Sequence, residues 1–160
     1  MTKLEMKVDA LVRIVTAADD EARRAAMEAL AKLEPDDDRK RERDYEIMVQ
    51  NILIELGVPT GIRGYGYLRD GILMAINNPG IVREMTKTFY PEIGNIHNTT
   101  GSRVARCVRH AIEACWSRGD YKVHEDYFGG TVSYTKGTPT AREFVTLIAE
   151  RIRMGNAKSW

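Results

Sequence analysis

The stretch NTTGSRVARCVRHAIEACWSRG, Asn98–Gly119, decides the fold of this chain. It combines a polar turn with a long helix, Ser102–Ser117, which Gly119 ends. At about 100° per residue, the apolar side chains of this helix gather on one side, within about 60° of one another. They are Val104, Val108, Ala111 and Cys115, flanked by Cys107 and Ile112. The pattern predicts a helix held by one face in a hydrophobic core.

The opposite side of the same helix is polar and rich in arginine. It carries Ser102, Arg106, Arg109 and Glu113, with Arg103 and His110 beside them. A guanidinium can donate two hydrogen bonds at once to guanine O6 and N7, and it also pairs with phosphate. The face therefore suits DNA recognition. The spacing of these residues is equally consistent with a solvated helix surface that binds no ligand.

The residues before this helix favour a helix-turn-helix. Pro91 suits the first turn of a short helix that runs to about Ile96, and Asn98–Thr100 form a polar turn with a capping side chain. A short helix, a turn and a long basic helix are the order of this motif, whose second helix enters the major groove. The sequence thus predicts a recognition helix at about residues 99–118.

The remaining segments are also predicted to be helical, so the expected fold class is all-α. A buried helix is expected around Ile47, Ile52, Ile54 and Leu56, ended by Gly57 and Pro59. Further helices are expected at Tyr67–Ile76, Ile81–Phe89, Asp120–Phe128 and from Thr138-Pro139 to about Arg153. Thr131–Thr135 is the only β-like run.

The first 34 residues are predicted to form a helical hairpin. Leu4, Val8, Leu11 and Val15 repeat at helical spacing, and a second helix would present Ala22, Ala26, Leu30 and Leu33 on one side. Two helices of this length cannot bury both stripes alone, so we expect the hairpin to oligomerise, to dock on the main domain or to dock on a partner. A charged linker or helix start at 35–44 follows, then the helix-turn-helix domain at 45–153 and a polar tail at 154–160.

Composition narrows the class of protein. The chain has 160 residues and a formal net charge of +1. Apolar residues make up 43% of it, which is enough for the core of one domain and a small accessory element. Cys107 and Cys115 lie eight residues apart on one predicted helix, so their Cα atoms would be roughly 12 Å apart, too far for a disulfide. Without an export signal or a membrane-length apolar run, we expect a cytoplasmic protein.

Several separated blocks resemble one known family. Besides residues 98–119, the blocks are ELGVPTGIRGYGYLRDGI at 55–72, FYPEIGNIHN at 89–98 and FGGTVSYTKGTPTAREF at 128–144. Over residues 45–153 the chain resembles the C-terminal effector domain of the stage-zero sporulation response regulator family. The resemblance implies a compact six-helix DNA-binding domain of a transcription factor that acts on short sites, often in tandem. It also implies that residues 61–66 form a turn between helices.

The resemblance also implies roles for individual residues. Arg106 looks like a base-reading arginine, and Arg103, Arg109 and His110 look like members of the same DNA-facing surface. Lys136 looks like a DNA-contacting lysine outside the recognition helix, and Thr100 and Ser102 sit where phosphate contacts are expected.

Two departures from the family pattern affect the prediction. Ala105 stands where the family usually carries a glutamate, so the hydrogen bond from cytosine would be lost there. The family's phospho-receiver domain is absent from these 160 residues, so control by receiver phosphorylation is not expected. An alternative is an interaction protein that heterodimerises with a full-length regulator and antagonises it.

The other residue patterns do not predict chemistry. His97, His110 and His124 lack the spacing of metal ligands, and no set of nucleophile, base and orienting group is present. We therefore expect a protein that is not an enzyme, with no metal, cofactor or small-molecule substrate. The expected partners are double-stranded DNA and, through the N-terminal helices, a second copy or another protein.

Overall fold

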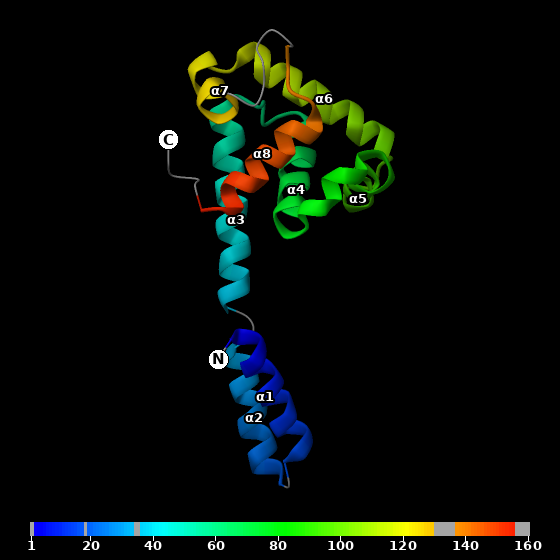
Figure 1. Ribbon diagram of the computed structural model, residues 1–160. Coiled ribbons are helices and arrows are strands. Elements are labelled where there is room, and N and C mark those ends of the chain that lie inside the picture. Colours follow the sequence, from blue (N-terminus) through cyan, green and yellow to red (C-terminus); the bar gives the residue numbers. More distant parts are fainter. Residues whose placement is uncertain (1, 18, 34–35, 130–136, 156–160) are drawn as a thin grey trace. The chain divides into compact units, whose positions relative to one another are not determined.

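The computed structural model describes residues 2–17, 19–33, 36–129 and 137–155. Within these ranges the chain forms α-helices, one 3-10 helix (η1) and one π-helix (η2), and no strand (Figure 1). The predicted all-α class is therefore confirmed. The chain divides into unit 1, Met1–Asp44, and unit 2, Tyr45–Trp160. No described helix combines the length and the apolarity that crossing a bilayer requires.

Unit 1 contains the predicted helical hairpin. Its helices α1 (Lys3–Thr16) and α2 (Asp20–Leu33) pack against each other. Thr2 and Glu5 form a capping box at the start of α1, and the Asp19 carboxylate accepts a hydrogen bond from the Ala22 amide at 2.7 Å. Each cap satisfies amide groups that a helix start leaves without partners, so both helices begin where the sequence places a capping side chain.

Helix α3 (Asp36–Leu56) begins in the segment expected to be a linker or a helix start. In unit 2 it buries Val49, Ile52, Leu53 and Leu56. The expectation that Ile47 and Ile54 would also be buried is wrong, since each is 56% exposed. The buried residues follow the i, i+3, i+4, i+7 pattern of one helix face, and at 100° per residue Ile47 and Ile54 fall on the other side.

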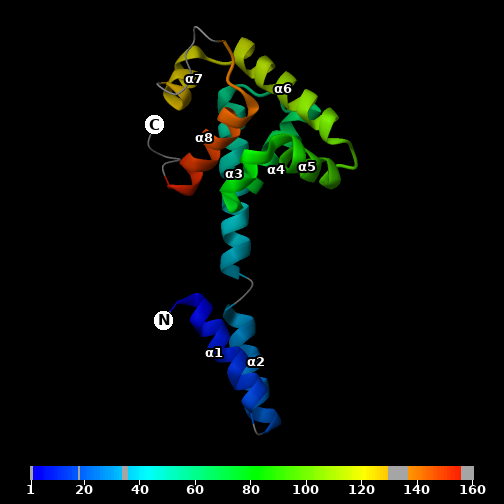
Figure 2. The same ribbon diagram turned by 45° about the vertical axis from the view of Figure 1, so that its right-hand side comes forward.

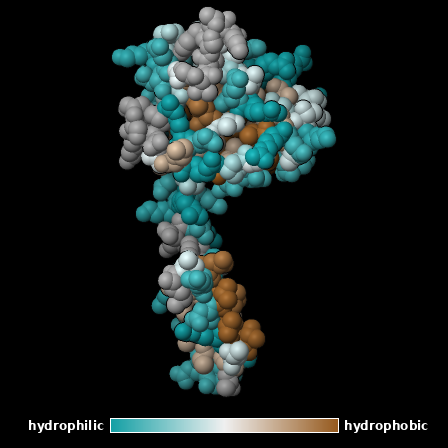
Figure 3. Space-filling model, viewed as in Figure 1, coloured by the Kyte–Doolittle hydropathy of each residue, from teal (hydrophilic) through white to brown (hydrophobic). Residues whose placement is uncertain are grey.

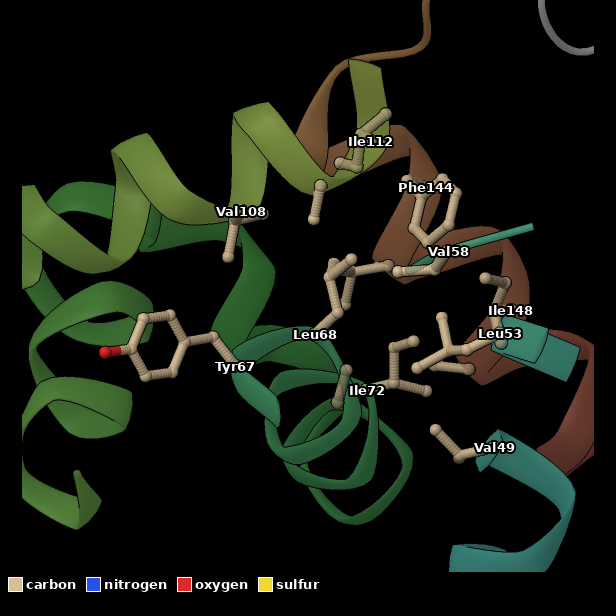
Figure 4. Close-up of a cluster of buried hydrophobic side chains, with 14 of the residues drawn as sticks. Val49, Leu53, Val58, Tyr67, Leu68, Ile72, Val108, Ile112, Phe144 and Ile148 are labelled. Atoms are coloured by element: carbon tan, nitrogen blue, oxygen red, sulfur yellow. The ribbon is translucent and has the colours of Figure 1, made fainter. Parts of the chain in front are cut away.

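Helix α4 (Arg63–Asn77) lies at the centre of unit 2 and packs against both α6 (Gly101–Arg118) and α8 (Ala141–Arg153). The buried side chains of these helices and of α3 point toward one another (Figure 4). At the centre lie Leu53, Leu68, Ile72, Val108, Phe144 and Ile148, each with 0% of its surface exposed. A single core thus anchors the helix that carries the arginines.

The start of α4 departs from the expected turn at residues 61–66. Arg63, Gly64, Tyr65 and Gly66 already belong to the helix. A Cβ on Gly64 would overlap the Cys107 carbonyl oxygen and would lie 2.6 Å from the Ala111 Cβ. Gly64 therefore lets α4 approach the backbone of α6, and this packing outweighs the low helix propensity of glycine.

The segment between α4 and α5 (Tyr90–Ile96) is helical but irregular. A 3-10 helix, Pro79–Glu84, leads into a π-helix, Met85–Phe89, where the sequence suggested one helix over Ile81–Phe89. Val82, Met85 and Phe89 are buried there. Because these residues are spaced three and four apart, the change of helix type keeps each of them directed at the core.

The C-terminal end of α6 is fixed by contacts with α3 and α7 (Tyr121–Phe128). The Cys115 thiol donates to the Leu56 carbonyl oxygen at 3.1 Å, and the ring of buried His124 contacts the same oxygen at 2.8 Å. His124 also stacks on Trp116, with ring centroids 4.3 Å apart. Burial raises the pKa of the Cys115 thiol to about 12, so this group stays protonated and remains a hydrogen-bond donor.

Candidate nucleic-acid interface

Helix α5, the turn 97–100 and α6 form the predicted helix-turn-helix. Pro91 occupies the first turn of α5, and the Thr100 hydroxyl accepts a hydrogen bond from the Arg103 amide at 3.3 Å to cap α6. Asn98 adopts a positive φ of 55°, a conformation that asparagine tolerates better than most residues. The turn passes close to α5, since a Cβ on Gly94 would lie 2.6 Å from the Thr99 carbonyl oxygen.

A polar cluster from α4 holds the turn in place. Asp70 accepts a hydrogen bond from Arg69 at 2.9 Å and contacts the His97 ring at 2.5 Å. The edge of the His97 ring also meets Tyr67, with ring centroids 4.9 Å apart. Because His97 is the C-cap of α5, these contacts connect the core helix α4 to the beginning of the turn.

Helix α6 has the two faces that its sequence predicts. Val104, Val108, Ala111, Ile112 and Cys115 are buried, and Cys107 is half-buried against the core. The polar side is solvent-exposed and is called here the arginine face; it comprises Ser102, Arg103, Arg106, Arg109, His110 and Glu113. Figures 1 and 2 both show α6 at the periphery of unit 2, with α4 and α5 on one side of it only.

The arginines of this face are available for a ligand. Within the described part of the chain, no ion pair joins Arg103, Arg106 or Arg109 to a carboxylate. Arg109 also lies near Tyr90: burial raises the pKa of the Tyr90 phenol, and the positive charges of Arg109 and Arg142 oppose that change. The face therefore presents guanidinium groups whose donors no other described residue uses.

Two hollows flank the start of α4 beside the arginine face. One, of about 450 Å³, is lined by Arg106, Arg109 and His110 together with Arg63. The other, of about 510 Å³, is lined by Arg103 and again by Arg63, next to His97 and Asn98. Arg63 is exposed, and in the described residues it has no acidic partner. It adds a cation that the sequence analysis did not select.

The sequence does not single out Arg63, because the family resemblance implies a turn at residues 61–66 and not a helix start. The signal in the sequence was the neighbouring Gly64, since a glycine inside a helix marks a close approach to another backbone. That approach is to Cys107 and Ala111 of α6, and it brings the preceding arginine beside the recognition helix.

The structure places the predicted site residues on one surface, with one exception. Thr100 and Ser102 are exposed at the start of α6, and Arg103, Arg106, Arg109 and His110 follow along it. Lys136 lies outside the described residues, as does the β-like run Thr131–Thr135. The half-buried side chain of Ala105 directly precedes Arg106.

A comparison with family models identifies the domain that carries this surface. Residues 49–152 match the family model described as "Sporulation initiation factor Spo0A C terminal". The match covers α4 to α7 completely, the C-terminal part of α3 from Val49 to Leu56, and all of α8 except Arg153. Domains of this kind are DNA-binding effector domains that act in the regulation of transcription. The chain therefore belongs to the family of Spo0A C-terminal domains and is a DNA-binding protein of transcription regulation.

Proposed function

We propose that this chain recognises a specific double-stranded DNA sequence by placing α6 in the major groove, with Arg106 as the principal base-reading residue. The supporting observation is the division of α6 into a fully buried apolar face and an exposed face with three arginines. A helix anchored in this way positions its guanidinium groups at low entropic cost, because the backbone that carries them is already fixed.

The other site residues take supporting roles in this proposal. Arg103 and Arg109 share base and phosphate contacts, and His110 belongs to the same surface. Thr100 and Ser102 lie at the N-terminus of α6, where hydroxyl groups and amide groups can meet a phosphate. Lys136 would contact the DNA backbone from outside the recognition helix.

Ala105 gives the proposed readout a specific feature. A glutamate at this position could accept a hydrogen bond from the amino group of cytosine, and alanine has no acceptor. We therefore propose that the base pair next to the one read by Arg106 is recognised loosely or through the methyl group of a thymine.

The proposal is tested by selecting bound duplexes from a random DNA library with the full chain. We expect a short enriched motif that contains guanine. The matched control carries alanine at Arg103, Arg106 and Arg109, and we expect it to enrich no motif. A wild-type selection indistinguishable from the input library would contradict sequence-specific binding.

A second candidate is an antagonist that pairs with another regulator without recognising DNA itself. The exposed apolar side chains of α1 and the loss of an acceptor at Ala105 favour it. A gel shift of the chain alone on random duplex DNA separates the two functions. Retarded DNA supports the direct regulator, and free DNA at all protein concentrations supports the antagonist.

Arg63 is expected to contact a DNA phosphate beside the recognition helix. Each phosphate contact contributes about 0.9 to the slope of log Kd against log salt concentration. The Arg63→Ala variant should therefore lower this slope by about 1 and weaken specific and random DNA alike. Lys122→Ala is the control, because exposed Lys122 lies on α7 and lines neither hollow. An unchanged slope in Arg63→Ala would remove this residue from the interface.

A further inference from the structure

Helix α1 is apolar on two sides, and α2 covers only one of them. The covered side contributes Ala10, which is 6% exposed, and Ala26 of α2 lies across from it at 8%. The other side carries Leu4, Val8, Leu11 and Val15, which are 71%, 51%, 50% and 80% exposed. These four residues are called here the α1 ridge. In Figure 3 brown atoms form a stripe along the side of unit 1 where Figure 1 draws α1.

We propose that the α1 ridge is a dimer interface, in which α1 pairs in parallel with α1 of a second copy of this chain. Among the described residues of unit 1, only Ala10 and Ala26 are buried apolar residues. Two short helices with so small a core are marginal in water. The hairpin therefore needs contact with a further apolar surface. That surface has to pack on the α1 ridge.

The order of residue types on the ridge selects a second copy. The 4-3-4 spacing puts Val8 and Val15 at heptad positions a, and Leu4 and Leu11 at positions d. A β-branched residue at a with leucine at d favours two parallel strands. Two identical ridges also satisfy the requirement of a twofold interface, in which the same residues meet from both sides.

The charged residues beside the ridge permit this pairing. Glu5 follows the first d position and Lys7 precedes the first a position, at the edges of the seam. In the parallel register Lys7 meets Val12 of the second copy, and Val12 is itself 52% exposed. The lysine stem would cover this valine. The register therefore brings no like charges into contact.

The exposed area is close to what a dimer requires. Full burial of a valine or leucine side chain removes roughly 60–120 Å² from water. The ridge and Val12, at their observed exposure, then supply roughly 400–700 Å² of apolar area in two copies. With the polar rim that forms about a third of a homodimer interface, the upper end of this range gives a total of roughly 1,000 Å², the lower limit of specific interfaces.

Sedimentation of the full chain without DNA tests the proposal independently of DNA binding. We expect wild-type protein to sediment as twice its mass of 18.1 kDa, and Leu11→Glu to sediment as a monomer at the same concentration. Met27→Glu is the matched control, because Met27 is an exposed apolar residue of α2 outside the ridge, and it should stay dimeric. A monomeric wild type would overturn the proposal.

Cross-linking tests the same interface without Leu11→Glu, which could also give a monomer by unfolding the hairpin. In a Cys107→Ser background, Val8→Cys should give covalent dimers with a short bismaleimide, because positions a of two parallel helices face each other. Arg13→Cys, on the far side of α1, should give none. Equal cross-linking of both variants, or of neither, would overturn the assigned interface.

Discussion

Replacing Gly64 with alanine is expected to lower the free energy of unfolding of unit 2 by about 3 kcal/mol, the upper end of the cost of overpacking a core. The new methyl group would overlap the Cys107 carbonyl oxygen and lie 2.6 Å from the Ala111 Cβ. Backbone cannot rotate out of the way as the end of a long side chain can. The helices α4 and α6 would have to separate, and Arg63 would move away from the arginine face.

Gly66 provides the matched control in the same helix. The nearest atom to a Cβ at this position is His97 Cε1, at the ordinary contact distance of 3.9 Å. Because glycine inside a helix costs roughly 0.5–1 kcal/mol relative to alanine, Gly66→Ala should be neutral or slightly stabilising. Urea unfolding followed by Trp116 fluorescence, in a Trp160→Phe background, measures both variants. Equal midpoints for Gly64→Ala and Gly66→Ala would show that α4 and α6 are not in close contact.

The sequence predicted the elements with strong periodicity. On α6, the apolar residues Val104, Val108, Ala111 and Cys115 fall on one side, and the structure buries all four. On α8, Phe144, Val145, Ile148 and Ile152 are buried as predicted. On α6 the capping side chain of Thr100 also marks the start, whereas α8 begins at Ala141 after the Thr140 cap, later than the predicted start at Thr138-Pro139. In these two helices the local sequence pattern and the tertiary packing agree, so the pattern is sufficient to predict which residues are buried.

The start of α4 shows where local rules fail. The family resemblance implies a turn at residues 61–66, and the low helix propensity of glycine is consistent with a turn there. The structure places Gly64 and Gly66 in the helix because Gly64 packs against α6. That contact joins residues more than forty positions apart, and periodicity within a segment carries no information about it. Arg63 was missed for the same reason.

The hairpin shows a second kind of limit. Periodicity identified the α1 ridge but could not say which of two apolar faces of α1 would meet α2. In the structure Ala10 lies on the face of α1 that meets α2, and Leu11 is half exposed. Small alanines let the two helices approach closely, and the larger leucines and valines are left to face outward. A sequence pattern counts both faces as apolar, so only the packing distinguishes them.

The Arg106→Ala variant is expected to weaken binding of the selected DNA site by about 1–3 kcal/mol, roughly 5- to 150-fold, with the loss confined to one base pair. Arg106 is exposed on the side of α6 opposite the buried stripe, and no acidic residue in the described part of the chain pairs with it. Its full set of donors is therefore free for a guanine. The measurement is competition binding with every single-base-pair variant of the site.

The Arg106→Lys variant separates base reading from simple charge. Lysine keeps the positive charge but lacks the planar fork that can donate two hydrogen bonds to guanine O6 and N7. We expect its salt dependence to equal that of wild type, because the number of neutralised phosphates is unchanged, while the preference at one base pair falls as in Arg106→Ala. If Arg106→Ala instead weakened all sequences equally and kept the same preference, Arg106 would be a phosphate contact. The reading residue would then have to be Arg103 or Arg109, the other guanidinium groups that α6 exposes on this face.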